Sequence, residues 1–380
     1  MSPPLVVHVV HRFDTGGMEN GMVNLFNAMP PERFRHAVVS LADYTDFRQR
    51  ITAQPVDFFA LNKQPGHDFS WVPGLWKLLR RLKPDLVHTR NLSTLEAQFV
   101  AAAAGVRHTV HGEHGRDVFD LHGQNRKYNL LRRAAQPFVS HYIAVSRDLA
   151  GWLRDTVRVP ERKIHQIYNG VDCKKFHPRT LDRPAVLPPG FAATDSVVVG
   201  SVGRMAEVKD YPALTRAFIR LVQDHPEAKR RVRLVIVGKG AARQPCLQSL
   251  SEAGLSELAW LPGERHDIAD IMRALDVFVL PSLNEGISNT ILEAQASGLP
   301  VIATRVGGNV ELVEDDIDGS MVAPGDVAGM AQALLRYLQD PARIARQGGE
   351  ARRRVEARFS IPAMAEAYGA VYEQALGRKD

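Results

Sequence analysis

The chain has 380 residues and a mass of 42.1 kDa, which is long enough for two domains. Hydrophobic residues make up 45% and charged residues 24%, so the composition is that of a globular protein and excludes a disordered or fibrous one. The two cysteines, Cys173 and Cys246, are far apart and in no CxxC pair. They therefore predict neither a disulfide scaffold nor a thiolate zinc site, and they favour a reducing cytoplasm. We expect the opening residues to form a strand, not a signal peptide, and no apolar run approaches the ~20 residues of a membrane span.

The net charge of +6 is distributed unevenly along the chain. Residues 1–180 contain 25 Lys and Arg against 16 Asp and Glu, whereas residues 181–380 contain 23 against 26. This asymmetry indicates two units that face different partners. The sequence has no basic stripe interleaved with aromatic residues and no zinc-finger spacing, so we expect no nucleic-acid ligand.

Short β-rich runs alternate with helix-length segments throughout, and several runs, such as VVVGSV at 197–202, are apolar without interruption. Continuous apolarity predicts strands covered on both faces, and hence parallel sheets built from βαβ units. Four prolines within residues 177–191 exclude a helix or central strand, so we predict a linker between two Rossmann-like α/β domains there. The predicted strands are 5–10, 36–41, 56–61, 85–89, 108–111, 142–145, 164–168, 197–202, 233–237, 277–280, 301–303 and 320–322.

The first candidate ligand site is the segment 13–29, which follows the first predicted strand and opens a helix. Its paired glycines, Gly16 and Gly17, would let backbone N–H groups approach a phosphate at the helix start. The segment is not GxGxxG, and no acidic residue marks a second strand end, so it does not favour NAD. A plain tight turn remains the alternative.

The second candidate is the segment 201–218, in which a strand is followed by Gly203, Arg204, a short loop, Lys209 and a helix. Two cations at the carboxyl end of a parallel strand suit a diphosphate, because ligands of open α/β sheets bind there. Two solvated loop charges remain the alternative.

The third and most informative candidate is the segment 281–304. Glu285 and Glu293 are eight positions apart, and Ser288 can cap a helix that carries Glu293. Eight helical residues would separate the carboxylates by ~12 Å, whereas the pair of a retaining hydrolase is ~5–5.5 Å apart. The spacing suits two contacts to one extended ligand, with an anion site at the helix start between them. A nucleotide sugar has this order of hydroxyl-rich and phosphate groups, and two surface glutamates are the alternative.

With these three segments in this order, the chain resembles a family-4 retaining glycosyltransferase with the GT-B fold. It is more narrowly similar to sugar transferases of exopolysaccharide clusters linked to PEP-CTERM/exosortase systems. The block with seven residues between its two glutamates is specific when it occurs together with NGVD and GR…K. The matching segments occur in the family's order over nearly the whole chain: TGGMENGMVNL, PDLVHTR, VHGEHG, IAVSRDL, IYNGVDCKKFHP, VGSVGRMAEVKD, LVIVGKG, EGISNTILE and GGNVELVEDDIDG.

The resemblance implies two Rossmann-like domains with a cleft between them and a C-terminal helix. We expect residues 1–178 to bind the acceptor, 179–191 to be the linker, 192–358 to bind the nucleotide sugar, and 359–380 to form a helix that packs back on the N-terminal domain. The implied activity is the retaining transfer of a hexose from a UDP- or GDP-linked sugar to a glycan or polyprenyl-linked acceptor in exopolysaccharide or cell-surface polysaccharide synthesis. Neither a metal nor another cofactor is expected.

The resemblance also implies roles for individual residues. Glu285 would contact the transferred sugar, and His111, with His114 as its substitute, would reach the sugar or the acceptor. Glu293 would hold the ribose hydroxyls. The remaining donor-binding positions would be the backbone or side chains of Gly17, Arg204, Lys209, Gly286, Ile287, Ser288, Asn289 and Thr290.

Two features depart from the family's pattern or bear on metal use. Many relatives have Pro two residues after the first glutamate, where this chain has Ile287 followed by Ser288, so the hydroxyl pattern of the donor sugar is open. No DxD pair stands in a matching context, and Asp315 and Asp316 resemble the family's acidic turn. Cations and the helix start can neutralise the leaving diphosphate in place of a metal.

A basic segment, 124–138, is relevant to the place where the protein would bind its acceptor. It can place Tyr128, Leu131, Ala135 and Phe138 on one helical stripe bordered by Arg126, Lys127, Arg132 and Arg133. Such a helix can lie on an anionic membrane, here the cytoplasmic face, or it can pack its stripe into its own domain. Two alternatives to the transferase also remain: a GT-B nucleotide-sugar 2-epimerase, and a non-catalytic nucleotide-sugar-binding subunit.

Overall fold

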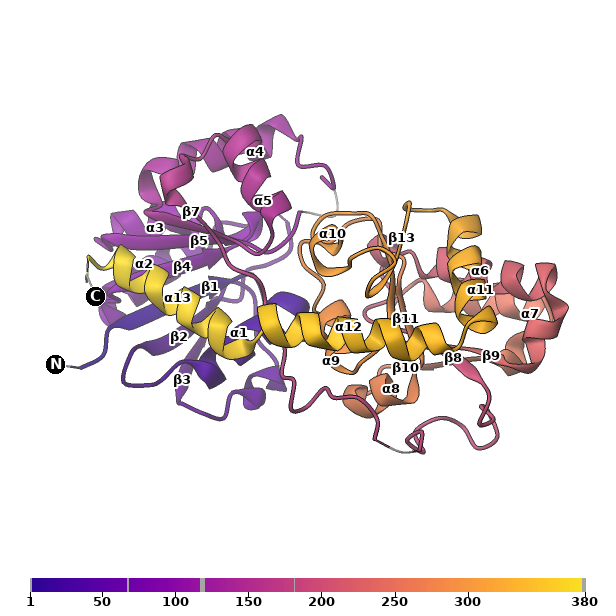
Figure 1. The fold of residues 1–380 in the computed structure, drawn as a ribbon. Helices are drawn as coiled ribbons and strands as arrows, with labels where there is room; N and C mark the ends of the chain where they lie inside the picture. Colours follow the sequence, from indigo (N-terminus) through magenta and orange to yellow (C-terminus); the bar gives the residue numbers. More distant parts are fainter. Residues whose placement is uncertain (1, 67, 117–119, 181, 378–380) are drawn as a thin grey trace. The chain divides into compact units, whose positions relative to one another are not determined.

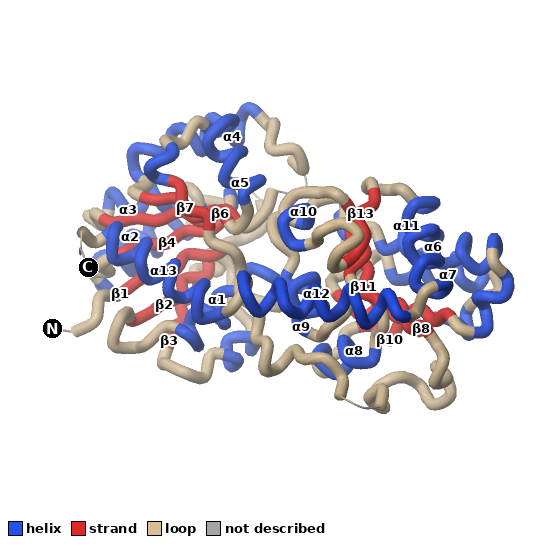
Figure 2. Tube along the Cα trace, in the orientation of Figure 1, coloured by secondary structure: helices blue, strands red, loops and turns tan. Residues whose placement is uncertain are grey.

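The computed structural model describes residues 2–66, 68–116, 120–180 and 182–377, and it divides into two compact units. Unit 1 comprises residues 1–170 together with 361–380, and unit 2 comprises residues 171–360. Each unit is built around one sheet, drawn in red in Figure 2. Every strand pair in both sheets is parallel. None of the helices in the described residues is long and apolar enough to cross a membrane.

Unit 1 contains a seven-stranded sheet in the order β3-β2-β1-β4-β5-β6-β7. Most strand residues are buried; in β1, for example, every residue after Leu5 is inaccessible to solvent. Burial on both faces is what continuous apolar runs predict, so the doubly wound parallel arrangement is confirmed here. The strands are β1 (Leu5–Val10), β2 (Arg35–Ser40), β3 (Val56–Ala60), β4 (Leu86–Arg90), β5 (His108–Glu113), β6 (His141–Ala144) and β7 (Ile164–Gln166).

Helices cover both faces of the unit 1 sheet. On one face, α1 and α13 pack against Val6, Leu86 and Val110. On the other face, α2 and α3 pack against Val7 and Val87. Each large apolar side chain buried in this way stabilises the fold by ~1.5–3 kcal/mol. The helices are α1 (Gly17–Ala28), α2 (Trp71–Leu82), α3 (Ala97–Ala103), α4 (Arg126–Ala135), α5 (Arg147–Trp152) and α13 (Ile361–Ala375).

The last helix, α13, belongs to unit 1 although most of unit 2 precedes it in the chain. Figure 1 shows it in yellow, lying along the sheet beside α1. Its buried side includes Tyr368 and Tyr372, and Arg33, in the turn before β2, forms ion pairs of 2.7 and 2.8 Å with Glu366 and Glu373.

The basic segment around α4 differs from its predicted arrangement. Tyr128, Leu131 and Ala135 pack inward against Leu92 and Leu95, so most of the predicted apolar stripe lies inside unit 1. Arg132, expected at the border of that stripe, is buried. The outward positions on α4 are instead occupied by Arg126, Lys127, Leu130 and Arg133.

Unit 2 contains a six-stranded sheet in the order β10-β9-β8-β11-β12-β13. Five strands match predicted runs, but the edge strand β10 was not predicted. Its sequence, AWLPG, includes a proline and is only half-buried, so it lacks the continuous apolarity of a central strand. The strands are β8 (Val197–Val202), β9 (Val232–Val237), β10 (Ala259–Gly263), β11 (Val277–Leu280), β12 (Val301–Thr304) and β13 (Gly319–Val322).

The core of unit 2 is formed by the sheet together with α6, α7 and α11. The proline-rich segment 177–191 forms neither helix nor strand in its described residues. The helices of this unit are α6 (Tyr211–Asp224), α7 (Arg243–Glu252), α8 (Ile268–Ala274), α9 (Asn289–Ala296), α10 (Asn309–Leu312), α11 (Val327–Gln339) and α12 (Ala342–Arg358).

Candidate functional site

The predicted donor-binding residues of unit 2 lie where its strand order reverses. In an open α/β sheet this switch point, beyond the carboxyl ends of the two central strands, is the place where ligands bind. The order β10-β9-β8-β11 puts the switch between β8 and β11. Gly203 and Arg204 follow β8, and the loop 281–288 follows β11. The second and third candidate segments therefore meet at one edge of the sheet.

Lys209 and Glu285 form the central charged pair of this edge. Lys209 ends a short 3-10 helix, Glu207–Lys209, and its Nζ lies 2.5 Å from Glu285 Oε1. The hydroxyl of buried Ser282 donates to the same carboxylate oxygen at 2.6 Å. The side chains of Lys209 and Glu285 are 22% and 10% exposed, so the pair is shielded but remains accessible to a ligand.

Ser288 caps α9, as predicted, because its Oγ accepts a hydrogen bond from the Ile291 N–H at 3.3 Å. The helix begins at Asn289, so Glu285 lies in the preceding loop. Glu285 and Gly286 were expected in a loop, which the structure confirms. The predicted separation of ~12 Å does not follow, because it applied the helical rise to this loop as well. Gly286, Ile287 and Ser288 are buried in this loop, and Asn289, Thr290 and Glu293 are partly exposed on the first turns of α9.

Two glycines outside the predicted set hold the Glu285 loop in place. A Cβ on Gly307 would lie 1.8 Å from the Glu285 carbonyl oxygen, and a Cβ on Gly308 would lie 2.2 Å from that of Gly286. The Gly308 N–H also donates to the Glu285 carbonyl at 3.2 Å. Only glycine permits such close backbone approach. The paired GG in GGNVELVEDDIDG was the available signal in the sequence.

Arg204 completes the cationic side of this edge. It is exposed, and it forms no ion pair with any residue that the structure describes. The neighbouring Gly203 has φ +154°, and a Cβ there would lie 2.7 Å from the buried Tyr211 hydroxyl. The turn that aims Arg204 outward therefore requires glycine. Arg204 is thus an exposed cation directly after β8, at the same edge of the sheet as the loop that carries Glu285.

In unit 1 the strand order reverses between β1 and β4, and the residues after these strands form a second polar edge. Gly17 is the first residue of α1, and the preceding Gly16 has an extended backbone with φ −162°. Asn91 follows β4 and was missed by sequence reasoning, although a polar residue directly after a strand was a usable signal. Its Oδ1 accepts from the His114 N–H at 2.8 Å, and its Nδ2 lies 3.7 Å from Met18 Sδ in the first turn of α1.

His111 lies inside the sheet, because β5 continues two residues beyond the predicted strand end. It is fully buried, with Nδ1 2.7 Å from Thr89 Oγ1 and Nε2 3.4 Å from Glu113 Oε1. Gln98 Nε2 donates to the same Thr89 oxygen. Because the Glu113 carboxylate can only accept, the His111 Nε2 carries a proton and donates it to Glu113.

Glu113 is buried and paired with Arg132, whose Nε donates to it at 2.7 Å. Burial acts to raise the pKa of Glu113, but the charge of Arg132 and the hydrogen bond from His111 outweigh it and bring the pKa to about 2. The carboxylate is thus ionised at every working pH, and it holds both the His111 ring and Arg132.

His114, the substitute for His111, offers a different geometry. Both ring nitrogens are buried, and neither has a hydrogen-bond partner among the described residues. Burial and the nearby Arg90 lower its pKa to about 3, so the ring is neutral. Its Nε2 lies 2.9 Å from where a Cβ on Gly112 would stand, so glycine is needed beside it.

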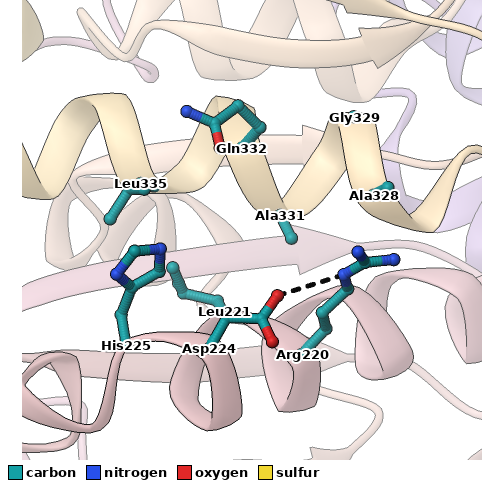
Figure 3. A pocket seen from close by; sticks show the side chains of 9 residues that line it. All are labelled: Arg220, Leu221, Asp224, His225, Ala328, Gly329, Ala331, Gln332 and Leu335. Atoms are coloured by element: carbon teal, nitrogen blue, oxygen red, sulfur yellow. Dashed lines mark hydrogen bonds and ion pairs between the residues drawn. The ribbon is translucent and has the colours of Figure 1, made fainter.

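Outside these two edges, a pocket of about 350 Å³ lies between α6 and α11 in unit 2. Figure 3 shows the Arg220–Asp224 ion pair on α6 facing the small residues of α11. No predicted site residue lines it. Within the described ranges, no group of three or more His, Cys, Asp or Glu side chains could hold a metal ion. The lining residues are Arg220, Leu221, Asp224, His225, Ala328, Gly329, Ala331, Gln332 and Leu335.

Comparison with known structures defines the fold. The crystal structure of Anabaena Alr3699/HepE in complex with UDP and glucose matches with a TM-score of 0.80 and 20% sequence identity, covering 98% of this chain and 100% of that one. Both parallel-sheet units are included in this match. The protein therefore has the GT-B fold, as the sequence resemblance implied.

Sequence comparison defines the family. Residues 15–175 match the model described as Glycosyltransferase Family 4, and residues 196–340 match Glycosyl transferases group 1. The UDP-Gal:alpha-D-GlcNAc-diphosphoundecaprenol alpha-1,3-galactosyltransferase of Escherichia coli is 30% identical over 338 residues, 85% of each chain. The lipopolysaccharide core mannosyltransferase LpcC of Rhizobium leguminosarum bv. viciae is 36% identical over 215 residues, 56% of this chain and 60% of that one. The chain belongs to glycosyltransferase family 4 and is a glycosyltransferase.

Proposed function

We propose that the protein transfers a hexose from a UDP- or GDP-linked sugar to a lipid-linked or polysaccharide acceptor during exopolysaccharide or cell-surface polysaccharide synthesis. The observation that carries this proposal is the Lys209–Glu285 pair at the switch point of unit 2, with the exposed Arg204 at the same edge of the sheet. The Escherichia coli relative is named for a UDP-galactose donor and a diphosphoundecaprenol-linked acceptor, which supports this choice of substrates.

The donor site divides into a charged part and a hydroxyl-binding part. Arg204 and Lys209 bind the diphosphate, and the start of α9 at Asn289 and Thr290 contributes backbone N–H groups to it. Glu293, one turn further along α9, binds the ribose hydroxyls. Glu285, supported by the backbone of Gly286, Ile287 and Ser288, binds the transferred sugar. Gly17 of unit 1 offers its N–H to the phosphates.

The reaction retains the anomeric configuration. The bond between the anomeric carbon and the diphosphate oxygen breaks, the acceptor hydroxyl attacks the same face, and its proton passes to the departing diphosphate. The cations and the helix start stabilise the charge on that diphosphate, so no metal is required. Both histidines remain candidates for the contact with the sugar or the acceptor: the nitrogens of His111 are engaged by Thr89 and Glu113, and those of His114 are buried but have no partner among the described residues.

We place the enzyme in the cytoplasm, at the inner face of the membrane, where a polyprenyl-linked acceptor is available. A role in exopolysaccharide clusters linked to PEP-CTERM/exosortase systems is part of the same proposal. The proposed acceptor domain is 1–178, and the proposed donor domain is 192–358. The linker between them is 179–191, and the C-terminal helix within 359–380 packs on the acceptor domain.

A thermal-shift screen against UDP-, GDP- and ADP-sugars tests the proposal most directly. A donor present at ~100 times its dissociation constant stabilises the folded protein by ~2.7 kcal/mol. Donor consumption is then followed with and without a polyprenyl-diphosphate-linked sugar. Turnover only with acceptor supports the transferase. Turnover without acceptor indicates the 2-epimerase, and binding without turnover indicates a non-catalytic subunit.

A further inference from the structure

Three helices of unit 1, α2, α3 and α4, contain no acidic residue, and the one acid directly beside them is the partly exposed Glu96 before α3. Their sequences, WVPGLWKLLRRL, AQFVAAA and RKYNLLRRAA, contain neither Asp nor Glu. The two helices on the opposite face have the reverse character: α1 and α13 contain Glu19, Glu366 and Glu373 and no Lys or Arg. The cations of α2, α3 and α4 are Lys77, Arg80, Arg81, Arg126, Lys127, Arg132 and Arg133.

Among the described residues, Arg132 is the one cation of this set that forms an ion pair, with the buried Glu113. Lys77, Arg80, Arg126 and Lys127 are exposed, and none of the four forms an ion pair with a residue in the described part of the chain. Their charge is therefore directed at solvent, and it can act on a ligand outside the unit.

Large apolar side chains lie among these cations. Trp76 is 41% exposed on α2, Leu130 is 66% exposed on α4, and Phe138, just after α4, is 41% exposed. Leu130 stands on α4 with Arg126 one turn before it. A leucine this exposed contributes little to the core, and together with Trp76 and Phe138 it places apolar surface among the cations.

The contacts join these side chains across the three helices. Trp76 Nε1 donates to the Ala103 carbonyl at the end of α3 at 3.2 Å, and the Arg80 guanidinium lies over the Trp76 ring at 6.0 Å. At the other side of α3, the rings of Phe99 and Phe138 meet at 5.2 Å. The exposed aromatic residues thus flank α3, and α4 directly precedes Phe138.

We propose that the outer side of α2, α3 and α4 is a docking surface for a bilayer containing anionic lipids. Unpaired Lys and Arg attract the negative headgroups, while Trp76, Leu130 and Phe138 insert at the boundary between headgroups and acyl chains. Aromatic residues prefer this boundary because their rings are apolar and their edges polar. The inference rests on the proposed lipid-linked acceptor, which such a surface would bring within reach of unit 1.

The test is sedimentation of the full chain with vesicles of phosphatidylcholine alone and with phosphatidylglycerol added, without donor or acceptor. We expect binding only to the anionic vesicles, weakened by salt. The fourfold variant Lys77→Gln, Arg80→Gln, Arg126→Gln, Lys127→Gln should bind at least about tenfold more weakly. A control with the same charge loss, Lys174→Gln, Lys175→Gln, Lys229→Gln, Arg230→Gln on exposed positions of unit 2, should bind like the unchanged protein.

Leu130→Gln separates insertion from charge attraction, and it should weaken binding to anionic vesicles without changing the slope against salt. Equal binding by the fourfold variant and its control, or no binding by the unchanged protein, would overturn the inference. So would salt-sensitive binding of duplex DNA that exceeds vesicle binding and is lost in the fourfold variant. Sugar transfer to a detergent-solubilised acceptor is measured in parallel, because it fails only if the proposed function is wrong.

Discussion

Glu113 in unit 1 and Glu285 in unit 2 are both carboxylates paired with a cation near the carboxyl end of a parallel strand, but their access to solvent differs. Glu113 and Arg132 are 0% and 3% exposed, whereas Glu285 and Lys209 are 10% and 22% exposed. A fully buried pair cannot be shared with a ligand unless the fold opens. A partly exposed pair can exchange its partner for a phosphate or a sugar hydroxyl. The same ion-pair chemistry thus supports the structure in one unit and substrate binding in the other.

The largest effect is expected for Glu113→Gln. It leaves Arg132 buried without a counter-charge, and breaking such a pair costs ~3–5 kcal/mol of the free energy of unfolding. Urea unfolding followed by tryptophan fluorescence measures this, because Trp152 lies under Arg132 with its ring 4.7 Å away. Arg154→Gln, which removes an exposed ion pair with Asp155 in the same unit, should leave stability unchanged. If the Glu113→Gln protein were as stable as the control, the Glu113–Arg132 pair would not support the structure, and the contrast with the Glu285–Lys209 pair would fail.

Glu285→Gln, in contrast to Glu113→Gln, should reduce turnover and not stability. The side chain keeps its shape but loses the charge that binds Lys209 and, as we propose, the reacting sugar. We expect turnover to fall about 100-fold while donor affinity changes less than about threefold, since the contact strengthens in the transition state. Steady-state kinetics with the lipid-linked acceptor measure both quantities. Asp224→Asn, in the remote α6 pair, is the control and should retain full turnover. A large loss of stability without loss of turnover would contradict the assignment.

Glu293→Ala tests the hydroxyl-binding part of the donor site. Loss of a charge-assisted contact to ribose should weaken donor binding by ~1.5–3 kcal/mol. Calorimetric titration with UDP or GDP alone isolates this contact, because these ligands carry the ribose but no transferred sugar. Glu285→Gln should bind the same nucleotide normally. Equal losses of nucleotide affinity in the two variants would contradict the proposal that Glu293 binds the ribose and Glu285 binds the transferred sugar.

The pH dependence of stability gives a smaller effect with a definite sign. Because Arg132 and His111 hold the pKa of Glu113 at about 2, below its unfolded value, its contribution is complete above the unfolded pKa and is lost as pH falls toward 2. The stability difference between the unchanged protein and Glu113→Gln should therefore shrink steadily from pH 5 to pH 3. The midpoints of urea unfolding of both proteins, measured across this range, give this difference. A stability difference that stays constant with pH would mean that Glu113 is not ionised in the folded protein.

The smallest expected effect concerns metal ions. If Arg204, Lys209 and the start of α9 neutralise the leaving diphosphate, transfer should continue unchanged in excess EDTA. Abolition by EDTA and recovery with Mg²⁺ or Mn²⁺ would show that the charged groups of unit 2 do not act alone.

Much of the fold followed from local patterns. Central strands such as β8 were predictable because burial on both faces demands continuous apolar residues. The Ser288 cap was predictable because a capping hydroxyl acts within one turn. Strand β10 was not, since an edge strand is covered less completely and its AWLPG sequence resembles a loop. On α4, the apolar spacing identified the buried stripe but not the burial of Arg132, which depends on a carboxylate 19 residues away.

By itself, the sequence determined two parallel α/β units and a family of enzymes, and it supplied the residue types of the proposed nucleotide-sugar site. Each of these rests on periodicity, caps or motifs that extend over a few residues. Only the tertiary structure decided which charges meet. Lys209 and Glu285 are 76 residues apart and come together because β8 and β11 are neighbours in the sheet. His111 and His114 are three positions apart, yet both nitrogens of His111 are engaged, whereas neither nitrogen of His114 has a partner in the described part of the chain. Burial and hydrogen bonding differ because they are set by the side chains that the fold brings from distant strands and helices.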